Sequence, residues 1–177
     1  MSETRKCVIA TPLLSDAATI EASDEVASMP AAHLQRFQPT DWWQTNSLGS
    51  GGQHLTVDLG ASPGNYNLIS LMYSNARSTT EWRVRTGLTE GGTTTDPNYD
   101  SGWIDHWPVS GLETWEWTHS LLWLPSGSEL NERWVRIDIR DAALDFYRAG
   151  RLYIANGWQP THHVKYGWGA GFNENSR

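Results

Sequence analysis

The sequence predicts an all-β protein, an antiparallel β-sandwich of the jelly-roll type. Short runs in which apolar and polar residues alternate one by one are typical of half-buried strands. Turn residues, chiefly Gly, Pro, Asn and Asp, separate these runs. Almost no stretch carries a helical apolar period, and no repeat of fixed length indicates a propeller or a solenoid. A chain of 177 residues is long enough for one domain with a proper core.

Residues 1–36 are expected to form an extended arm. The best helix-forming stretch of the chain, Asp16 to Val26, lies within them, but Pro12 and Pro30 bracket it and its apolar periodicity is poor. We therefore expect an extended chain with room for one short helix. It has no core of its own and reaches a neighbouring subunit.

Residues 37–157 are expected to form the sandwich. The clearest strand runs from Trp134 to Arg140, where three branched apolar residues share one face and charged residues share the other. The stretch from Leu68 to Tyr73 is apolar on both faces, which fits a central strand. The predicted strands in chain order are 55–59, 68–73, 81–85, 134–140 and 151–155.

The end of the chain, residues 158–177, differs in composition from the sandwich. Glycine, histidine and aromatic residues crowd together there without strand alternation. Such a tail cannot bury itself. We expect it to lie on the sandwich or on a neighbouring subunit.

Tryptophan is unusually frequent, with eleven residues against three phenylalanines. If residues 113–123 form a strand, one face of it carries a stripe that is either a core wall or a binding surface. Trp82 shares the apolar face of its strand and is expected in the core. Trp42 and Trp43 cannot both point inward, so one of them is partly exposed. The stripe consists of Trp115, Trp117, His119, Leu121 and Trp123.

Composition excludes several classes of protein. The formal charge of −7, spread along the chain, argues against nucleic acid as a partner. The single cysteine, Cys7, cannot form an internal disulfide. The first residues lack the apolar core of a signal peptide, and no run is long enough to span a bilayer, so we expect synthesis in the cytoplasm and no membrane insertion.

Catalytic motifs are absent from the sequence, which predicts a protein that is not an enzyme. There is no nucleophile elbow, P-loop or zincin motif. Glu113 and Glu116 would point to opposite faces of a strand, so they make no acid–base pair. Metal ligands at zinc spacing are lacking too, and we predict no cofactor. A structural calcium held by loop carbonyls and Asp58 or Asp96 is compatible with such a sandwich.

Two groups of residues are candidates for binding. The first lies in a loop that combines indole faces for stacking with polar groups for hydroxyls, and it suits a sugar or a partner protein. It consists of Trp103, Asp105, His106 and Trp107. The second holds exposed indoles and cations that suit a subunit interface. It consists of Trp134, Arg136, Arg140, Trp158, Tyr166 and Trp168.

The chain resembles discoidin-type, galactose-binding-like jelly rolls over about residues 40–155. The residues that carry the resemblance are Trp42-Trp43 before a Gly-rich loop, Leu55–Gly60, Trp82–Val84, Tyr99–Trp103, Trp134–Ile139 and Leu152–Ile154. The resemblance implies binding of carbohydrate or lipid head groups through loops at one end of the sandwich. The disulfide that closes the extracellular members of that family is absent here.

The end of the chain resembles tail proteins of long-tailed bacteriophages. The matching stretches are 150–154, 158–160 and 166–171. From both resemblances we expect a structural protein of a phage tail tip or baseplate. It would be located in the virion, contact other tail proteins and assemble as a homo-oligomer. The alternative is a carbohydrate-binding module that recognises a host surface glycan through Trp103, Asp105, His106 and Trp107.

Overall fold

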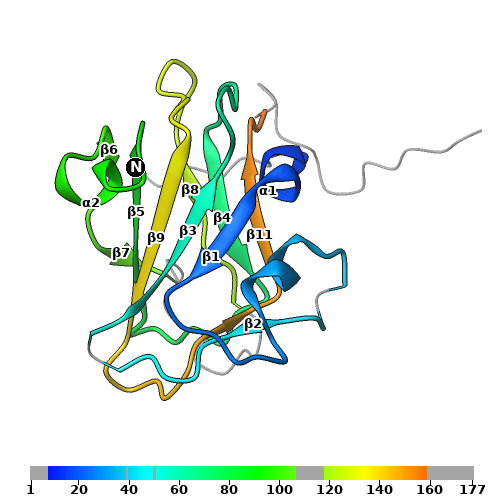
Figure 1. The fold of residues 1–177 in the computed structure, drawn as a ribbon, viewed down its shortest axis with the longest axis vertical. Coiled ribbons are helices and arrows are strands. Elements are labelled where there is room, and N and C mark those ends of the chain that lie inside the picture. The colour runs from blue at the N-terminus through cyan, green and yellow to red at the C-terminus, as the bar shows by residue number, and fades with distance from the viewer. Residues whose placement is uncertain (1–7, 39, 50, 107–117, 159–177) are drawn as a thin grey trace, which may run out of the picture.

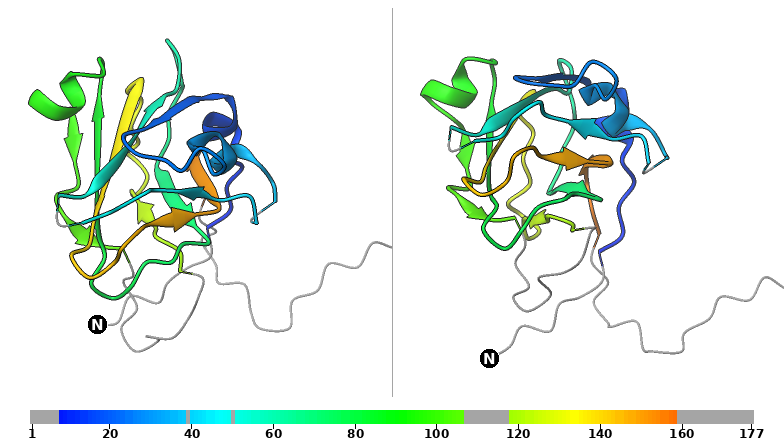
Figure 2. Two further views of the ribbon diagram at one scale, coloured as in Figure 1. Left: turned by 60° about the horizontal axis from the view of Figure 1, so that its bottom comes forward. Right: turned by 90° about the horizontal axis from the view of Figure 1, so that it is seen from below.

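The protein folds as an antiparallel β-sandwich, as the sequence predicts. The structure is a computed structural model that describes residues 8–38, 40–49, 51–106 and 118–158. Figure 2 shows the two main sheets as two layers, with loops joining them at both ends. In the described part of the chain, no helix is long and apolar enough to cross a membrane.

The elements are short, and most of them are strands (Figure 1). The helices are α1 (Leu13–Ala17), the 3-10 helix η1 (Ala31–Gln35) and α2 (Gly92–Thr95). The strands are β1 (Thr19–Ala22), β2 (Trp43–Gln44), β3 (Gln53–Asp58), β4 (Leu68–Met72), β5 (Glu81–Gly87), β6 (Tyr99–Asp100), β7 (Ile104–Asp105), β8 (Leu122–Trp123), β9 (Trp134–Arg140), β10 (Arg148–Ala149) and β11 (Arg151–Ala155).

The larger sheet has six strands in the order β1-β3-β9-β5-β6, with β7 pairing beside β6 along the same edge of β5. The smaller sheet has the order β11-β4-β8, and β10 and β2 form a separate pair. All pairs are antiparallel, and all five predicted strands are present. Residues 68–73, predicted as a central strand, supply β4 at the centre of the smaller sheet.

The core lies between the two sheets and follows the alternation of the sequence. Val135, Ile137 and Ile139 of β9 are fully buried, and they face Leu152 and Ile154 of β11 within one apolar cluster. The burial of such side chains is the main favourable contribution to folding. The same alternation places the charged residues of β9 on the outer face of the larger sheet.

The tryptophans of the core follow their predicted positions. Trp82 is 1% exposed and Trp43 is fully buried, whereas Trp42 is partly exposed and lies under the guanidinium of Arg148, 4.2 Å from its carbon. The buried indole of Trp43 also contacts the ring of Tyr147, with centroids 5.8 Å apart. One tryptophan of the adjacent pair points inward and the other outward, as expected for extended backbone.

The N-terminal segment differs from the expected free arm, because its described residues pack on the sandwich. Strand β1 pairs with β3 and forms the edge of the larger sheet. Helix α1 covers β11, where the Ser15 hydroxyl donates to the Leu152 carbonyl at 3.0 Å. Arg151 is 3% exposed beneath this segment and pairs with Asp16 at 2.6 Å. A buried arginine needs this cover and its carboxylate, which explains why the segment is folded.

The tryptophan stripe of residues 113–123 lies partly outside the described residues, which begin again at Thr118. Within the described part, His119 and Leu121 are exposed whereas Thr118 and Ser120 are buried. His119 and Leu121 therefore point away from the core, whereas Trp123, the third described member of the stripe, is partly buried. Strand β8 is only two residues long, and before it Ser120 bonds the backbone of Leu71 through both its amide and its hydroxyl.

Candidate functional site

Loops from both sheets meet at the end of the sandwich opposite α1, and they hold one another in place. The β4–β5 loop (73–80) and the β9–β10 loop (141–147) run across this end, seen from below in the right panel of Figure 2. The Arg77 guanidinium donates to the Ala143 carbonyl at 3.0 Å. The hydroxyls of Thr79 and Thr80 donate to Asp141 at 2.9 and 2.7 Å. These contacts fix the two loops relative to each other.

A hollow of about 400 Å³ opens between these loops and the ends of β5 and β9. Its walls carry carboxylate, guanidinium and hydroxyl groups together with two alanine methyl groups. The lining residues are Thr79, Glu81, Arg140, Asp141, Ala142 and Ala143. Polar groups that converge on a concave site of this kind are typical of small-ligand recognition.

Trp103 borders the hollow through its contact with Arg140. The guanidinium carbon of Arg140 lies 4.0 Å from the centroid of the Trp103 ring, a cation–π contact. The same guanidinium pairs with Glu81 at 2.7 Å, and both charged side chains are more than a third exposed. An indole that directly precedes β7 thus lies beside a cation of β9 and a carboxylate of β5 on the outer face of the larger sheet.

Asp105 of β7 lies next to this group. In the β5–β7 register it lies opposite Glu81, and Ile104 lies opposite Trp82. Asp105 is exposed, and its carboxylate makes no hydrogen bond or ion pair with the described residues. Its carboxylate is therefore available to accept hydrogen bonds from a ligand. The structure thus brings together two of the four residues predicted for ligand binding, Trp103 and Asp105, with Arg140 from the predicted interface group.

His106 does not belong to this site, which corrects the sequence-based prediction. It is fully buried, with Nε2 2.6 Å from the Tyr147 hydroxyl and its ring 5.7 Å from that of Trp82. Burial lowers the pKa of His106 from 6.5 to about 3, so the ring is neutral near pH 7. The side chain turns inward because it alternates with the exposed Asp105. Trp107, the fourth predicted residue, lies outside the described residues.

Of the residues predicted for a subunit interface, some lie on the described surface and others lie outside the described residues. Trp134, Arg136 and Arg140 all project from the outer face of β9, as the alternation requires. Trp158 is 61% exposed, and its backbone forms an isolated bridge with Ile9. Tyr166 and Trp168 lie outside the described residues.

A second aromatic contact at the loop end was not predicted. Tyr73, which directly follows β4, packs edge-on against His119, with ring centroids 5.0 Å apart, and its amide donates to His119 Nδ1 at 3.0 Å. The φ angle of Tyr73 is 57°, a left-handed conformation that is costly for a tyrosine. No motif of the sequence signals this geometry, because it depends on contacts between β4 and a distant loop.

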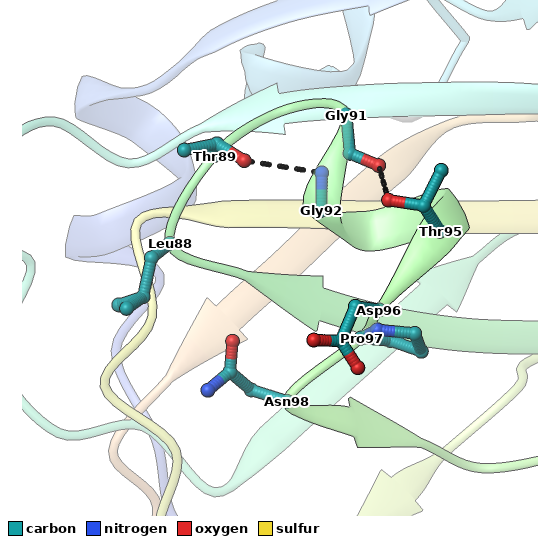
Figure 3. A pocket seen from close by; sticks show the side chains of 8 residues that line it. All are labelled: Leu88, Thr89, Gly91, Gly92, Thr95, Asp96, Pro97 and Asn98. Carbon is teal, nitrogen blue, oxygen red and sulfur yellow. Dashed lines mark hydrogen bonds between the residues drawn. The ribbon is translucent and has the colours of Figure 1, made fainter.

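Another hollow lies at the opposite end of the sandwich, around α2 (Figure 3). It measures about 760 Å³, but one loop forms it, and the loop satisfies its own polar groups. The Gly92 amide donates to Thr89 Oγ1 and the Thr95 hydroxyl donates to the Gly91 carbonyl, both at 3.1 Å. It lacks an aromatic platform, so the smaller hollow beside Trp103 is the better candidate. Its lining residues are Leu88, Thr89, Gly91, Gly92, Thr95, Asp96, Pro97 and Asn98.

The residues considered for calcium lie apart. Asp58 is held by Arg133, whose Nε and terminal nitrogen both donate at 2.6 Å, and this hydrogen bonding lowers the pKa of the carboxyl. Asp96 is exposed in the loop of Figure 3. Among the described residues, no three His, Cys, Asp or Glu side chains are grouped so as to hold a metal ion.

Glu81, Thr79 and Asp141 are site residues that sequence reasoning missed. Glu81 reads as an ordinary charged residue at the start of an alternating strand. Its role follows from strand pairing, which places it between Arg140 of β9 and Asp105 of β7. Asp141 directly follows the clearest predicted strand. In the sequence, the one signal for such a loop position is a polar residue that directly follows a predicted strand.

Comparison with known proteins places the fold but not the family. No family model matches the chain, and no curated protein matches it. Solved structures do match. The family 32 carbohydrate-binding module of C. perfringens NanJ, in complex with galactose, aligns with a TM-score of 0.57 at 15% identity, over 85% of this chain and 100% of that one.

Two further structures align over similar lengths. A histidine mutant of the lectin binding domain of lectinolysin, complexed with Lewis b, has a TM-score of 0.58 and 13% identity, over 82% of this chain and 96% of that one. Chitosan-binding module 1 of a chitosanase/glucanase from Paenibacillus sp. IK-5 has a TM-score of 0.55 and 15% identity, over 80% and 96%. Identities this low leave family membership open. The chain therefore shares the galactose-binding-like β-sandwich fold of family 32 carbohydrate-binding modules, as its discoidin-type sequence pattern predicts.

Proposed function

We propose that this protein is a carbohydrate-binding module that recognises a glycan through the loop-end hollow beside Trp103. The observation that carries the proposal is the fixed group of Trp103, Arg140 and Glu81 at the rim of that hollow. The shared fold supports it, since the similar structures include modules bound to galactose and to Lewis b. A fold alone hosts many functions, so the argument depends on the site.

Each group of the site matches one part of a sugar ring. The indole of Trp103 offers an apolar surface for the C–H face of a pyranose, with its N–H as a polar handle. Glu81, Asp105 and Arg140 offer charge-assisted hydrogen bonds to hydroxyl groups, which are stronger than neutral ones. Because Glu81 already holds Arg140, little side-chain freedom is lost on binding.

The expected role as a structural protein of a phage tail remains a prediction. The similar structures named above are carbohydrate-binding or lectin domains, and they favour the glycan-binding alternative over subunit contacts. Oligomeric state, partner proteins and location in a virion are all untested. A glycan-binding module carried on a phage particle would be consistent with both the phage-tail role and the glycan-binding role.

A glycan array tests the proposal. The purified chain is applied to the array, and the strongest hit is then titrated by calorimetry into the wild type and three variants. We expect Trp103→Ala and Glu81→Gln each to weaken binding at least tenfold. Leu88→Ala is the matched control, because Leu88 is 69% exposed at the other end of the sandwich. Unchanged affinity in Trp103→Ala, with the fold intact by circular dichroism, would contradict this site.

A further inference from the structure

We propose that the outer face of the larger sheet carries a second recognition element, an oxyanion site centred on Arg136 that binds the carboxylate or sulfate group of an acidic sugar. The sugar part of this inference rests on the proposed function. The anion part rests on the charges of β3, β5 and β9 alone.

The site has one more guanidinium than carboxylate. Arg85 and Arg136 lie directly opposite each other on β5 and β9, a like-charge pair that destabilises a sheet unless an anion bridges it. Both bind Asp138: Arg85 through Nε and one terminal nitrogen at 3.1 and 2.7 Å, and Arg136 through Nε at 2.9 Å. One carboxylate therefore serves two arginines, and one positive charge is left over.

The excess charge resides on Arg136. Neither of its terminal nitrogens bonds a described residue. Both nitrogens are open to solvent, because no nitrogen of Arg136 is both buried and without a hydrogen-bond partner. Its side chain is nevertheless only 20% exposed, so the fork is held in place. Two neighbouring arginines of the same face differ, because each has a carboxylate of its own: Arg83 pairs with Asp100, and Arg140 with Glu81.

The residues around Arg136 suit an oxyanion. Thr56 of β3 lies opposite Arg136 and His54 opposite Asp138, so a hydroxyl and an imidazole flank the guanidinium fork. Burial lowers the pKa of His54, and the charge of Arg136 lowers it further, with Asp138 opposing and Arg85 adding. Two of the three charges that act on His54 are thus positive. A planar fork whose two terminal nitrogens bond no described residue matches the geometry of a carboxylate or a sulfate.

Carboxylates limit the site to a single anionic group. Asp58, Asp100 and Glu21 lie on the same sheet around the excess charge, and the chain as a whole carries −7. An extended polyanion such as nucleic acid would meet these carboxylates and be repelled. One acid group on an otherwise neutral oligosaccharide would not.

The position of Arg136 links the site to the hollow. Arg136 and Arg140 share one face of β9 and are four residues apart, which corresponds to roughly 13 Å at the rise of a β-strand. An oligosaccharide that stacks on Trp103 can run along the sheet and place an acid group at Arg136. The two contacts would then act as linked binding elements on one ligand.

Heteronuclear NMR tests the oxyanion site without the hollow. The side-chain Nε–H signals of the arginines are followed while sodium sulfate, glucuronate or glucose is added to the full chain at constant ionic strength. We expect sulfate and glucuronate to shift the Arg136 signal more than that of Arg83, and glucose to leave it unchanged. Equal shifts at both arginines would mean screening without a site and would overturn the inference.

Two variants separate this inference from the proposed function. In Arg136→Gln we expect an acidic glycan to lose its advantage over its neutral counterpart, about tenfold for a charge-assisted hydrogen bond, while the neutral glycan binds as in the wild type. The matched control Arg83→Gln should keep the advantage. If Trp103→Ala binds neutral glycans normally, the hollow is refuted, yet the Arg136 shift can still occur. If Arg136→Gln keeps the full advantage, the oxyanion site is refuted, yet the hollow can still bind.

Discussion

The buried side chain of His106 makes the unfolding free energy depend on pH, and the variant His106→Gln removes this dependence. His106 is fully buried and bonded to Tyr147, with a folded-state pKa lowered from 6.5 to about 3 by burial. The unfolded chain therefore takes up a proton at a higher pH than the folded chain. The contribution of neutral His106 is fully present above pH 6.5 and is lost as the pH falls toward 3.

The two pKa values give the size of the effect. At pH 5 the unfolded state gains about 2 kcal/mol from protonating His106, at about 1.4 kcal/mol per pH unit below 6.5. In a chain of 177 residues, 1 kcal/mol corresponds to a change in melting temperature of about 2–4 °C. This one residue should therefore lower the melting temperature by about 4–8 °C between pH 7 and pH 5.

The assay compares the wild type with His106→Gln by chemical denaturation from pH 7.5 to 4.5. The variant should be less stable at pH 7, because the bond to Tyr147 and the packing against Trp82 are perturbed. The difference in unfolding free energy should then shrink by about 2 kcal/mol on going to pH 5. His54→Gln is the comparison: burial also lowers the pKa of His54, but this histidine is only half-buried, so its difference from the wild type should shrink less. Parallel pH profiles for the wild type and His106→Gln would refute the reasoning.

Two further predictions concern the packing of the sandwich, both read from urea unfolding. Asp16→Asn should cost about 3 kcal/mol, because it leaves the guanidinium of Arg151 buried without its carboxylate, and a loss below about 0.5 kcal/mol would contradict that role. Gly52→Ala should cost about 2 kcal/mol or more, since φ is +70° and a Cβ would lie 2.5 Å from the Ile139 carbonyl oxygen. The control Gly49→Ala has open space around the new Cβ and should cost about 1 kcal/mol. Equal losses of unfolding free energy in the two variants would contradict this account.

The strands and their faces could be predicted because alternation reports burial directly. In β9 the residues read as apolar, Val135, Ile137 and Ile139, are fully buried, and Trp134 and Arg136 lie on the outer face as predicted. The predicted class of fold follows from this pattern and from the turn residues between the strands. Local patterns suffice wherever one face of an element is buried.

The N-terminal segment shows why the rest could not be predicted. Thr19 to Ala22 has weak alternation, and it becomes a strand because the edge of β3 offers unpaired backbone groups. Arg151 reads as a surface residue, but α1 and η1 cover it. Both outcomes depend on segments more than thirty residues away in sequence, which no local pattern encodes.

Only part of the candidate site could be predicted from the sequence, because its other residues are brought together by strand pairing. Trp103 and Asp105 were identifiable by residue type, as an indole near a polar group in a loop. His106 was misassigned because it directly follows β7, where alternation after the exposed Asp105 turns it inward. Glu81 and Arg140 join the site through cross-strand pairing, which sequence spacing does not reveal.

A crystal structure of the chain with the strongest glycan from the array tests the central claim most directly. The account predicts a sugar ring in the hollow between the β4–β5 and β9–β10 loops, against the indole of Trp103, with hydroxyls within hydrogen-bonding distance of Glu81 or Arg140. A sugar bound instead in the α2 hollow of Figure 3, or beside Tyr73 and His119 without contact to Trp103, would contradict it.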